Sequence, residues 1–309
     1  MFAGPTVAAG AVDHLADALS RAHPGLLAAA VALHVCGQVC RGLAWRGVLG
    51  AAWPRVPRRR VCAWHVCGAG LSGVLSTRGG DAVRIALARR ELPGATWPAL
   101  AGTLAAEGSF ETAFGLVLTL VAVWLGVGTL HAPPVALVIA VALVLPLAVA
   151  AAARCERVRR VGRDVGRGLA VLRRPRRVLV AVLPWQLGAR LLRLGAATCF
   201  LLAFGLPAAP AVVIAACAAQ GSGAMVPLPG GGPATMAGAL LVALPIAAGH
   251  PVDAGAVAAL AIAWPAALTT VGVTVSLALL TALTGVRSPR ALLRAVRVLR
   301  PQPTAAGPI

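Results

Sequence analysis

Hydrophobic and polar positions follow one another along this chain in long blocks. A helix needs about 20 apolar residues to span a membrane, and the runs that approach or exceed this length are residues 25–50, 98–128, 132–153, 178–206 and 255–285. Shorter apolar runs occupy residues 61–76, 211–228 and 234–250. The pattern predicts an all-α fold, a polytopic transmembrane helical bundle with six to eight spans.

Composition agrees with a membrane protein. Apolar residues make up 59% of the 309 residues and charged residues only 12%, which is less charge than an ordinary soluble domain carries. The net charge of +19 comes from basic residues clustered at the ends of apolar runs, and only 4% of residues are aromatic. Retention of positive charge on one side of a membrane explains this distribution better than binding to nucleic acid.

Three arginine-rich segments set the expected topology. Arginines near helix ends are retained in the cytoplasm, so we place residues 55–60, 154–177 and 286–309 there. The second and third have helical spacing and are either amphipathic helices on anionic headgroups or plain topology signals. We predict one integral membrane domain over residues 1–309, with a first half (25–153), a basic linker (154–177), a second half (178–285) and a basic tail (286–309).

The two halves echo each other weakly. Each has a long helix with glutamine, tryptophan and arginine, then a short apolar run and a glycine-rich segment, TRGGD at 77–81 and PLPGGGP at 227–233. Paired, glycine- or proline-interrupted apolar segments are typical of transporters built from repeats. We predict two structural repeats, with chance similarity in an Ala/Leu-rich chain as the alternative.

Residues 61–76 suit a re-entrant segment better than a span. Sixteen residues are short for a crossing. A segment that enters and returns also keeps the following arginines on the cytoplasmic side, as the charge rule requires. These are Arg78, Arg84, Arg89 and Arg90.

Charged residues also lie inside apolar runs. Glu107 and Glu111 are four residues apart and share one helix face. A buried carboxylate costs several kcal/mol unless it is paired, protonated or in a wet cavity. Arg41 and Arg190 lie deep and need acceptors, whereas Arg193 can reach an interface. Salt bridges, a substrate path or both explain these charges, and the excess of arginine suits an anion such as a lipid phosphate.

Glycines are predicted to break helices at two places. Gly79 and Gly80 permit unusual backbone conformations, and Asp81 is a plausible N-cap for a helix over residues 82–91, with Arg84 on the same face. In the second half, a break at membrane depth or a plain connecting loop is formed by Pro229, Gly230, Gly231 and Gly232.

Neither a metal site nor a cofactor site is predicted. The histidines and cysteines between residues 34 and 67 match no standard zinc spacing, and the seven cysteines form no disulfide framework. We expect these side chains to serve packing, and we find no recognisable catalytic set.

These segments together resemble a flippase-like membrane family that includes the transmembrane region of lysylphosphatidylglycerol synthases. RGLAWRGVLGA (41–51) is similar to its Arg-Trp-Arg signature, STRGGDAVR (76–84) to its Pro-x-x-x-Gly-Glu-x-x-Arg loop, EGSFE (107–111) to its Glu-Arg-x-x-Asp motif and PLPGGGP to its Pro-Gly-Gly-x-Gly loop. Departures from the family pattern include Asp81, Gly108, Glu111, Pro233 and Met236.

The resemblance implies a multi-pass protein of the bacterial cytoplasmic membrane that moves a phospholipid or related amphiphile between leaflets. We expect membrane phospholipids as partners, and a headgroup site formed by Arg41, Arg78, Asp81, Arg84, Glu107, Glu111, Arg190 and Arg193. The chain ends about where the family's membrane region ends, so we expect no aminoacyl-transferase domain and no enzyme activity. A membrane enzyme for a lipid-linked substrate and a non-transporting accessory subunit are the alternatives, and the oligomeric state stays open.

Overall fold

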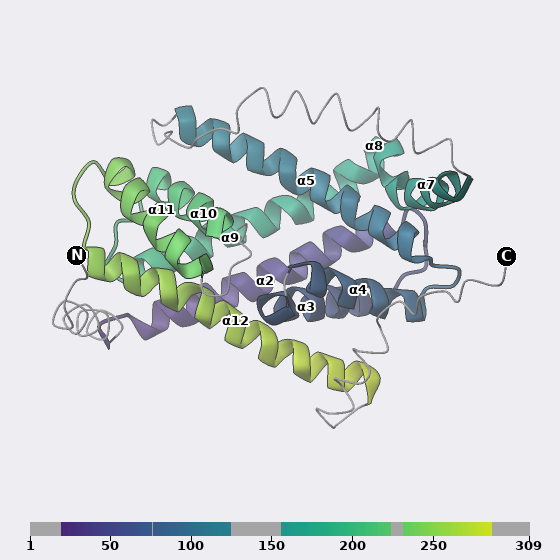
Figure 1. The fold of residues 1–309 in the computed structure, drawn as a ribbon, viewed down its shortest axis with the longest axis horizontal. Coiled ribbons are helices and arrows are strands. Elements are labelled where there is room, and N and C mark those ends of the chain that lie inside the picture. Colours follow the sequence, from purple (N-terminus) through teal and green to yellow (C-terminus); the bar gives the residue numbers. More distant parts are fainter. Residues whose placement is uncertain (1–19, 76, 125–155, 224–230, 286–309) are drawn as a thin grey trace.

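Helices make up the fold. The computed structural model describes residues 20–75, 77–124, 156–223 and 231–285, in which no strand occurs (Figure 1). The first half contains α2 (Pro24–Leu49), α3 (Arg58–Leu75), α4 (Thr77–Glu91) and α5 (Trp97–Trp124). The rest contains α7 (Glu156–Gly168), η1 (Leu169–Arg173), α8 (Pro175–Arg177), η2 (Val178–Val182), α9 (Leu183–Ala203), α10 (Pro210–Gly223), α11 (Gly231–Ala248) and α12 (Ala254–Thr284).

The apolar runs predicted these helices closely because local signals fix their ends. Proline stands at the start of α2, where its fixed φ suits a helix and its missing N–H is no loss. The side chain of Asp253 caps α12 by accepting from the Gly255 amide at 2.8 Å. Gly285 ends the helix with a φ of 68°, which glycine adopts without strain. The predicted run 132–153 lies outside the described residues.

The bundle contains membrane-spanning helices, as predicted. Among the described residues, three helical stretches are long and apolar enough to cross a membrane, namely Pro24–Leu49, Pro175–Ala203 and Ala254–Leu283. Shorter apolar helices cover Pro210–Gln220 and Met236–Ala248. A helical membrane bundle is therefore confirmed, while the total of six to eight spans stays a prediction.

Helices α2 and α9 pack along each other at the centre, with α5 and α12 along opposite long edges (Figure 1). Two helix pairs flank this centre. The first helix pair, α3 and α4, packs against α12 and α2, and the second helix pair, α10 and α11, packs against α12 and α9. Each half thus contributes one long central helix and one pair of shorter helices.

The prediction that residues 61–76 enter and return by themselves is wrong, because α3 is one continuous helix that ends at Leu75. The return is made by α4, since Arg60 at the start of α3 lies 3.4 Å from Glu91 at the end of α4. Arg84, expected on the cytoplasmic side, is instead buried within this returning helix. The two helices approach closely, since a Cβ at Gly68 would lie 2.6 Å from the Gly80 carbonyl oxygen.

The prediction that Asp81 caps a helix is wrong. Helix α4 begins at Thr77, so Gly79, Gly80 and Asp81 lie inside it. Neither glycine has a positive φ. The physical reason for glycine at position 80 is the close approach of α3, which leaves no room for a side chain.

In the second half, α10 ends at Gly223 and α11 begins at Gly231. The break predicted here stays a prediction, because residues 224–230 lie outside the described residues. Gly231 and Gly232 form the first turn of α11 rather than a loop, and Pro229 and Gly230 lie outside the described residues.

The basic linker is largely helical. Helix α7 packs on α5, where a Cβ at Gly168 would clash with backbone atoms of residues 99–103. Thr96 Oγ1 donates to Asp164 Oδ2 at 2.9 Å, which ties α7 to the start of α5. The amphipathic form predicted for this linker is therefore present in α7, and the basic tail lies outside the described residues.

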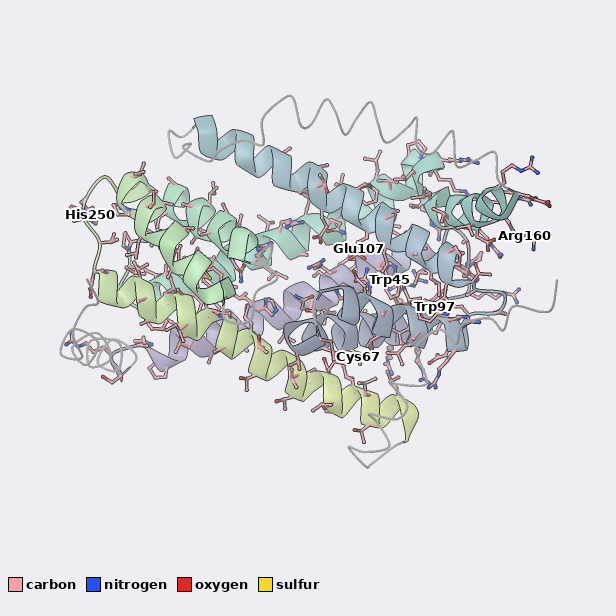
Figure 2. The ribbon with its side chains drawn as sticks, in the orientation of Figure 1. Trp45, Cys67, Trp97, Glu107, Arg160 and His250 are labelled. Carbon is pink, nitrogen blue, oxygen red and sulfur yellow. The ribbon has the colours of Figure 1, made fainter. Side chains whose placement is uncertain are left out.

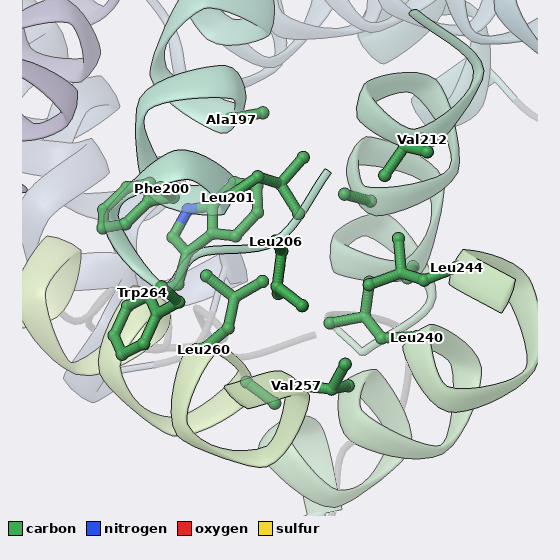
Figure 3. Close-up of a cluster of buried hydrophobic side chains, with 14 of the residues drawn as sticks. Ala197, Phe200, Leu201, Leu206, Val212, Leu240, Leu244, Val257, Leu260 and Trp264 are labelled. Atoms are coloured by element: carbon green, nitrogen blue, oxygen red, sulfur yellow. The ribbon is translucent and has the colours of Figure 1, made fainter. Parts of the chain in front are cut away.

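The second half is held together by an apolar core. Phe200 and Trp264 stack with their ring centroids 4.9 Å apart, and the same cluster contains leucines of α9, α11 and α12 and valines of α10 (Figure 3). Leu240, Leu244 and Leu260 are fully buried there. The first half instead packs around Trp45 and Trp64, where charged residues are also buried.

Candidate functional site

A buried ion pair lies at the centre of the first half. Glu107 on α5 is 2% exposed and Arg84 on α4 is 7% exposed. Arg84 Nη2 donates to Glu107 Oε2, while Arg84 Nε lies 3.4 Å from Asp81 Oδ1 and Nη1 lies 2.9 Å from His65 Nδ1. Charge is tolerated at this depth because the guanidinium has two hydrogen-bond acceptors and a second carboxylate within ion-pair distance.

Trp45 of α2 supports this ion pair. Its ring lies under the Arg84 guanidinium, with Cζ 4.7 Å from the ring centroid, which is a cation–π geometry. Its Nε1 donates to Thr103 Oγ1 on α5 at 3.0 Å. Figure 2 shows Trp45 and Glu107 together in the interior. The tryptophan therefore fixes the positions of α2, α4 and α5 relative to one another.

The second carboxylate, Glu111, joins the two halves of the chain. Its Oε1 lies 2.6 Å from Arg41 Nη2 on α2, and its Oε2 lies 3.6 Å from Arg190 Nη2 on α9. Arg41 Nη2 is also 3.9 Å from Glu107 Oε1. Because one arginine comes from each central helix, Glu111 holds α2 and α9 to the same face of α5.

A chain of polar side chains continues from Arg84 toward α2. His65 Nε2 lies 3.3 Å from Gln38 Oε1, and Gln38 Nε2 lies 3.2 Å from His34 Nε2. His65 is 1% exposed. Four side chains from three helices thus form one continuous hydrogen-bonded series.

These groups border a cavity of about 340 Å³ between α2, α3, α4 and α12. Its charged and polar wall consists of Arg41, Arg84, Asp81, His34, Gln38 and His65, together with Ser72 and Thr269. A smaller apolar hollow of about 50 Å³ borders it and shares the wall residues His34, Gln38, Ala69, Gly70 and Leu268. Valines 31, 35, 66, 271 and 275 complete this apolar hollow.

The structure brings most of the predicted site residues together. Six of them form one network, namely Arg41, Asp81, Arg84, Glu107, Glu111 and Arg190. Arg193 instead bonds to α10, where its Nη2 donates to Gln220 Oε1 at 3.1 Å and to the Cys217 carbonyl at 3.3 Å. The side chain of Arg78 lies outside the described residues.

Sequence reasoning missed the neutral polar residues of the cavity. His34 and His65 were expected to serve packing, and Gln38 was noted only for the internal repeat. One signal was available: His34, Gln38 and Arg41 recur at four- and three-residue spacing, which puts three polar side chains on one face of an apolar helix.

A helical bundle with spanning helices, buried ion pairs and a polar cavity is typical of an integral membrane protein. The sequence model of the lysylphosphatidylglycerol synthase TM region matches residues 6–266, and the chain belongs to this family. The resemblance seen in its motifs is thereby confirmed. No curated protein and no solved structure matches the chain.

Proposed function

We propose that this protein moves an anionic or aminoacylated phospholipid, or a related amphiphile, between the leaflets of the bacterial cytoplasmic membrane. The observation that carries the proposal is the polar cavity with its neighbouring apolar hollow. An amphiphile needs both environments side by side, one for the headgroup and one for the start of an acyl chain.

The charge of the cavity wall favours an anionic headgroup. Two arginines and one aspartate line it, while Glu107 and Glu111, which pair with these arginines, lie outside the lining. The surface that a headgroup meets therefore has one more positive than negative group while the histidines are neutral. Arginine suits a phosphate because its planar guanidinium donates several hydrogen bonds in a fixed geometry.

Arg41 is the arginine best placed to contact the headgroup. Its side chain is 34% exposed, against 8% for Arg84, and its pairing with Glu111 at 2.6 Å involves only Nη2. Arg84 is already bound by His65 and Glu107. We therefore assign ligand contact first to Arg41 and a positioning role to Glu107, whose carboxylate is too buried to receive a headgroup amine.

Reconstitution into liposomes tests this function. Full-length protein is placed in vesicles that contain phosphatidylglycerol labelled with a fluorophore on an acyl chain, and dithionite bleaching reports how fast label moves between leaflets. We expect the protein to accelerate this movement and Arg41→Gln to reduce the rate about tenfold or more, as expected for loss of a charge-assisted hydrogen bond.

The matched control is Arg60→Gln, which removes an arginine from an exposed ion pair away from the cavity. Its rate should equal that of the unmodified protein. The proposal is abandoned if vesicles with protein show no faster movement of labelled anionic or aminoacylated phospholipids than empty vesicles.

An accessory subunit without transport activity is the second candidate. The observation that favours it is the second helix pair, because α10 and α11 contain no charged residue. In that case Glu107→Gln would lower the amount of protein in the membrane, and no lipid movement would be seen with the unmodified chain.

A further inference from the structure

The polar series that begins at Arg84 has a fixed direction. An arginine has only donors, so His65 Nδ1, 2.9 Å from Arg84 Nη1, must accept. A neutral His65 then carries its hydrogen on Nε2 and donates to Gln38 Oε1. The Gln38 amide nitrogen in turn faces His34 Nε2, which accepts. Because Arg84 can only donate, it determines the tautomers of His65 and His34 and the orientation of the Gln38 amide.

This direction makes His65 neutral as long as its Nδ1 accepts from Arg84. A second proton on Nδ1 would occupy the atom that accepts from Arg84 and would place two cations 2.9 Å apart. His65 is 1% exposed, so water screens this repulsion poorly.

The surroundings of His65 contain charges of both signs. Helix α2 presents His34 and Arg41, α4 presents Asp81 and Arg84, and α5 presents Glu107. Helix α3 itself carries Cys62 and Cys67, and α12 contains no titratable side chain. An added proton on His65 therefore needs a further anion, and the cavity is the place where one can enter.

We propose that the cavity binds one proton, on His65, together with each anionic headgroup. The inference rests on the proposed function and deepens it by identifying a proton as the second ligand. A headgroup phosphate replaces His65 as the acceptor for Arg84 Nη1. His65 then takes a proton from the aqueous phase on Nδ1 and donates it as a hydrogen bond to the same phosphate.

Two consequences follow from this exchange of acceptors. Binding of the headgroup favours the proton and the proton favours the headgroup, by the same factor, because linkage is reciprocal. Affinity for the headgroup should thus fall as the pH rises, by up to about tenfold per unit for one linked proton. A proton gradient across the membrane could then drive the lipid in one direction.

Calorimetry with the full-length protein in detergent measures the proton directly. Soluble dihexanoyl phosphatidylglycerol is titrated at one pH into protein in two buffers with different ionisation enthalpies, and the difference in binding heat gives the number of protons taken up. We expect about one proton per lipid for the unmodified protein, and about none for His65→Gln, which retains an acceptor for Arg84. The control His250→Gln changes an exposed histidine far from the cavity and should leave the proton number unchanged.

The outcomes separate the two proposals. Binding without proton uptake by the unmodified protein overturns the proton site and leaves the headgroup site standing. Absence of binding in both buffers overturns the proposed function and the proton site together. Loss of proton uptake in His34→Gln, with normal uptake in His65→Gln, would overturn the assignment to His65.

Discussion

The two helix pairs occupy corresponding places in the halves of the chain but differ in chemistry. The first helix pair carries His65, Asp81 and Arg84 and borders the cavity. The second contains no charged residue and packs into an apolar core (Figure 3). One half therefore holds the buried charge, and the other is packed almost entirely through aliphatic and aromatic side chains.

The partners of the arginine side chains also differ between the two halves. In the first half, Arg84 and Arg41 are paired with carboxylates. In the second half, Arg190 reaches across to Glu111 of the first half at 3.6 Å, and Arg193 is held by an amide oxygen and a backbone carbonyl. Arg193 is therefore held in the fold by neutral partners, whereas Arg84 and Arg41 belong to a network of charges that borders the cavity. On the proposed function, the first half binds the ligand and the second mainly contributes stability.

The largest effect should come from removing the buried carboxylate. Glu107→Ala leaves Arg84 charged and without its nearest anion, which is expected to destabilise the fold by about 3–5 kcal/mol. Denaturant unfolding in detergent measures it. The control Glu91→Ala, at an exposed ion pair, should change stability by less than about 1 kcal/mol. Similar losses in the two variants would contradict the structural account of the first half.

A change in the apolar core should affect stability without affecting ligand binding. Leu240→Ala removes a fully buried side chain of α11 and should cost about 2–5 kcal/mol through lost packing contacts. Affinity for a short-chain anionic phospholipid should stay the same in the protein that remains folded. A marked loss of affinity would show that the second half takes part in binding.

Replacing a glycine by alanine should change stability in opposite directions in the two helix pairs. Gly80→Ala places a Cβ against the backbone of α3 and should destabilise by about 1–3 kcal/mol. Gly238→Ala in α11 meets no atom within 4 Å and should stabilise by up to about 1 kcal/mol through higher helix propensity. Thermal unfolding of the two variants checks the sign of each change, and equal signs would contradict the close packing seen at Gly80.

The sequence predicted the helices well because their signals are local. Run length, Pro24 and the cap at Asp253 each act within a few residues. The predicted start of α4 was too late in the chain. Gly80 is required by the close approach of α3, and this packing cannot be read from the residues next to Gly80. A Gly-Gly-Asp sequence favours a turn when the neighbouring helix is unknown.

The sequence predicted most residues of the charged network, but not which arginine pairs with which acid. Salt bridges from Glu107 and Glu111 to arginines of other helices were one of the expected explanations, and both acids form them. Which arginine meets which acid depends on how α2, α4 and α9 cross α5, and a single sequence carries no such information. The role of His65 was hidden for the same reason, because its partners come from α2 and α4.

The central claim is that the first half binds the anionic headgroup, and a paired measurement on two central-helix arginines tests it most directly. Calorimetric affinity for dihexanoyl phosphatidylglycerol is compared in Arg41→Gln and Arg193→Gln. We predict that Arg41→Gln lowers the affinity about tenfold or more, because it removes a guanidinium from the cavity wall. Arg193→Gln should leave the affinity unchanged, because the native Arg193 side chain binds α10 instead. Equal losses, or a loss confined to Arg193→Gln, would contradict it.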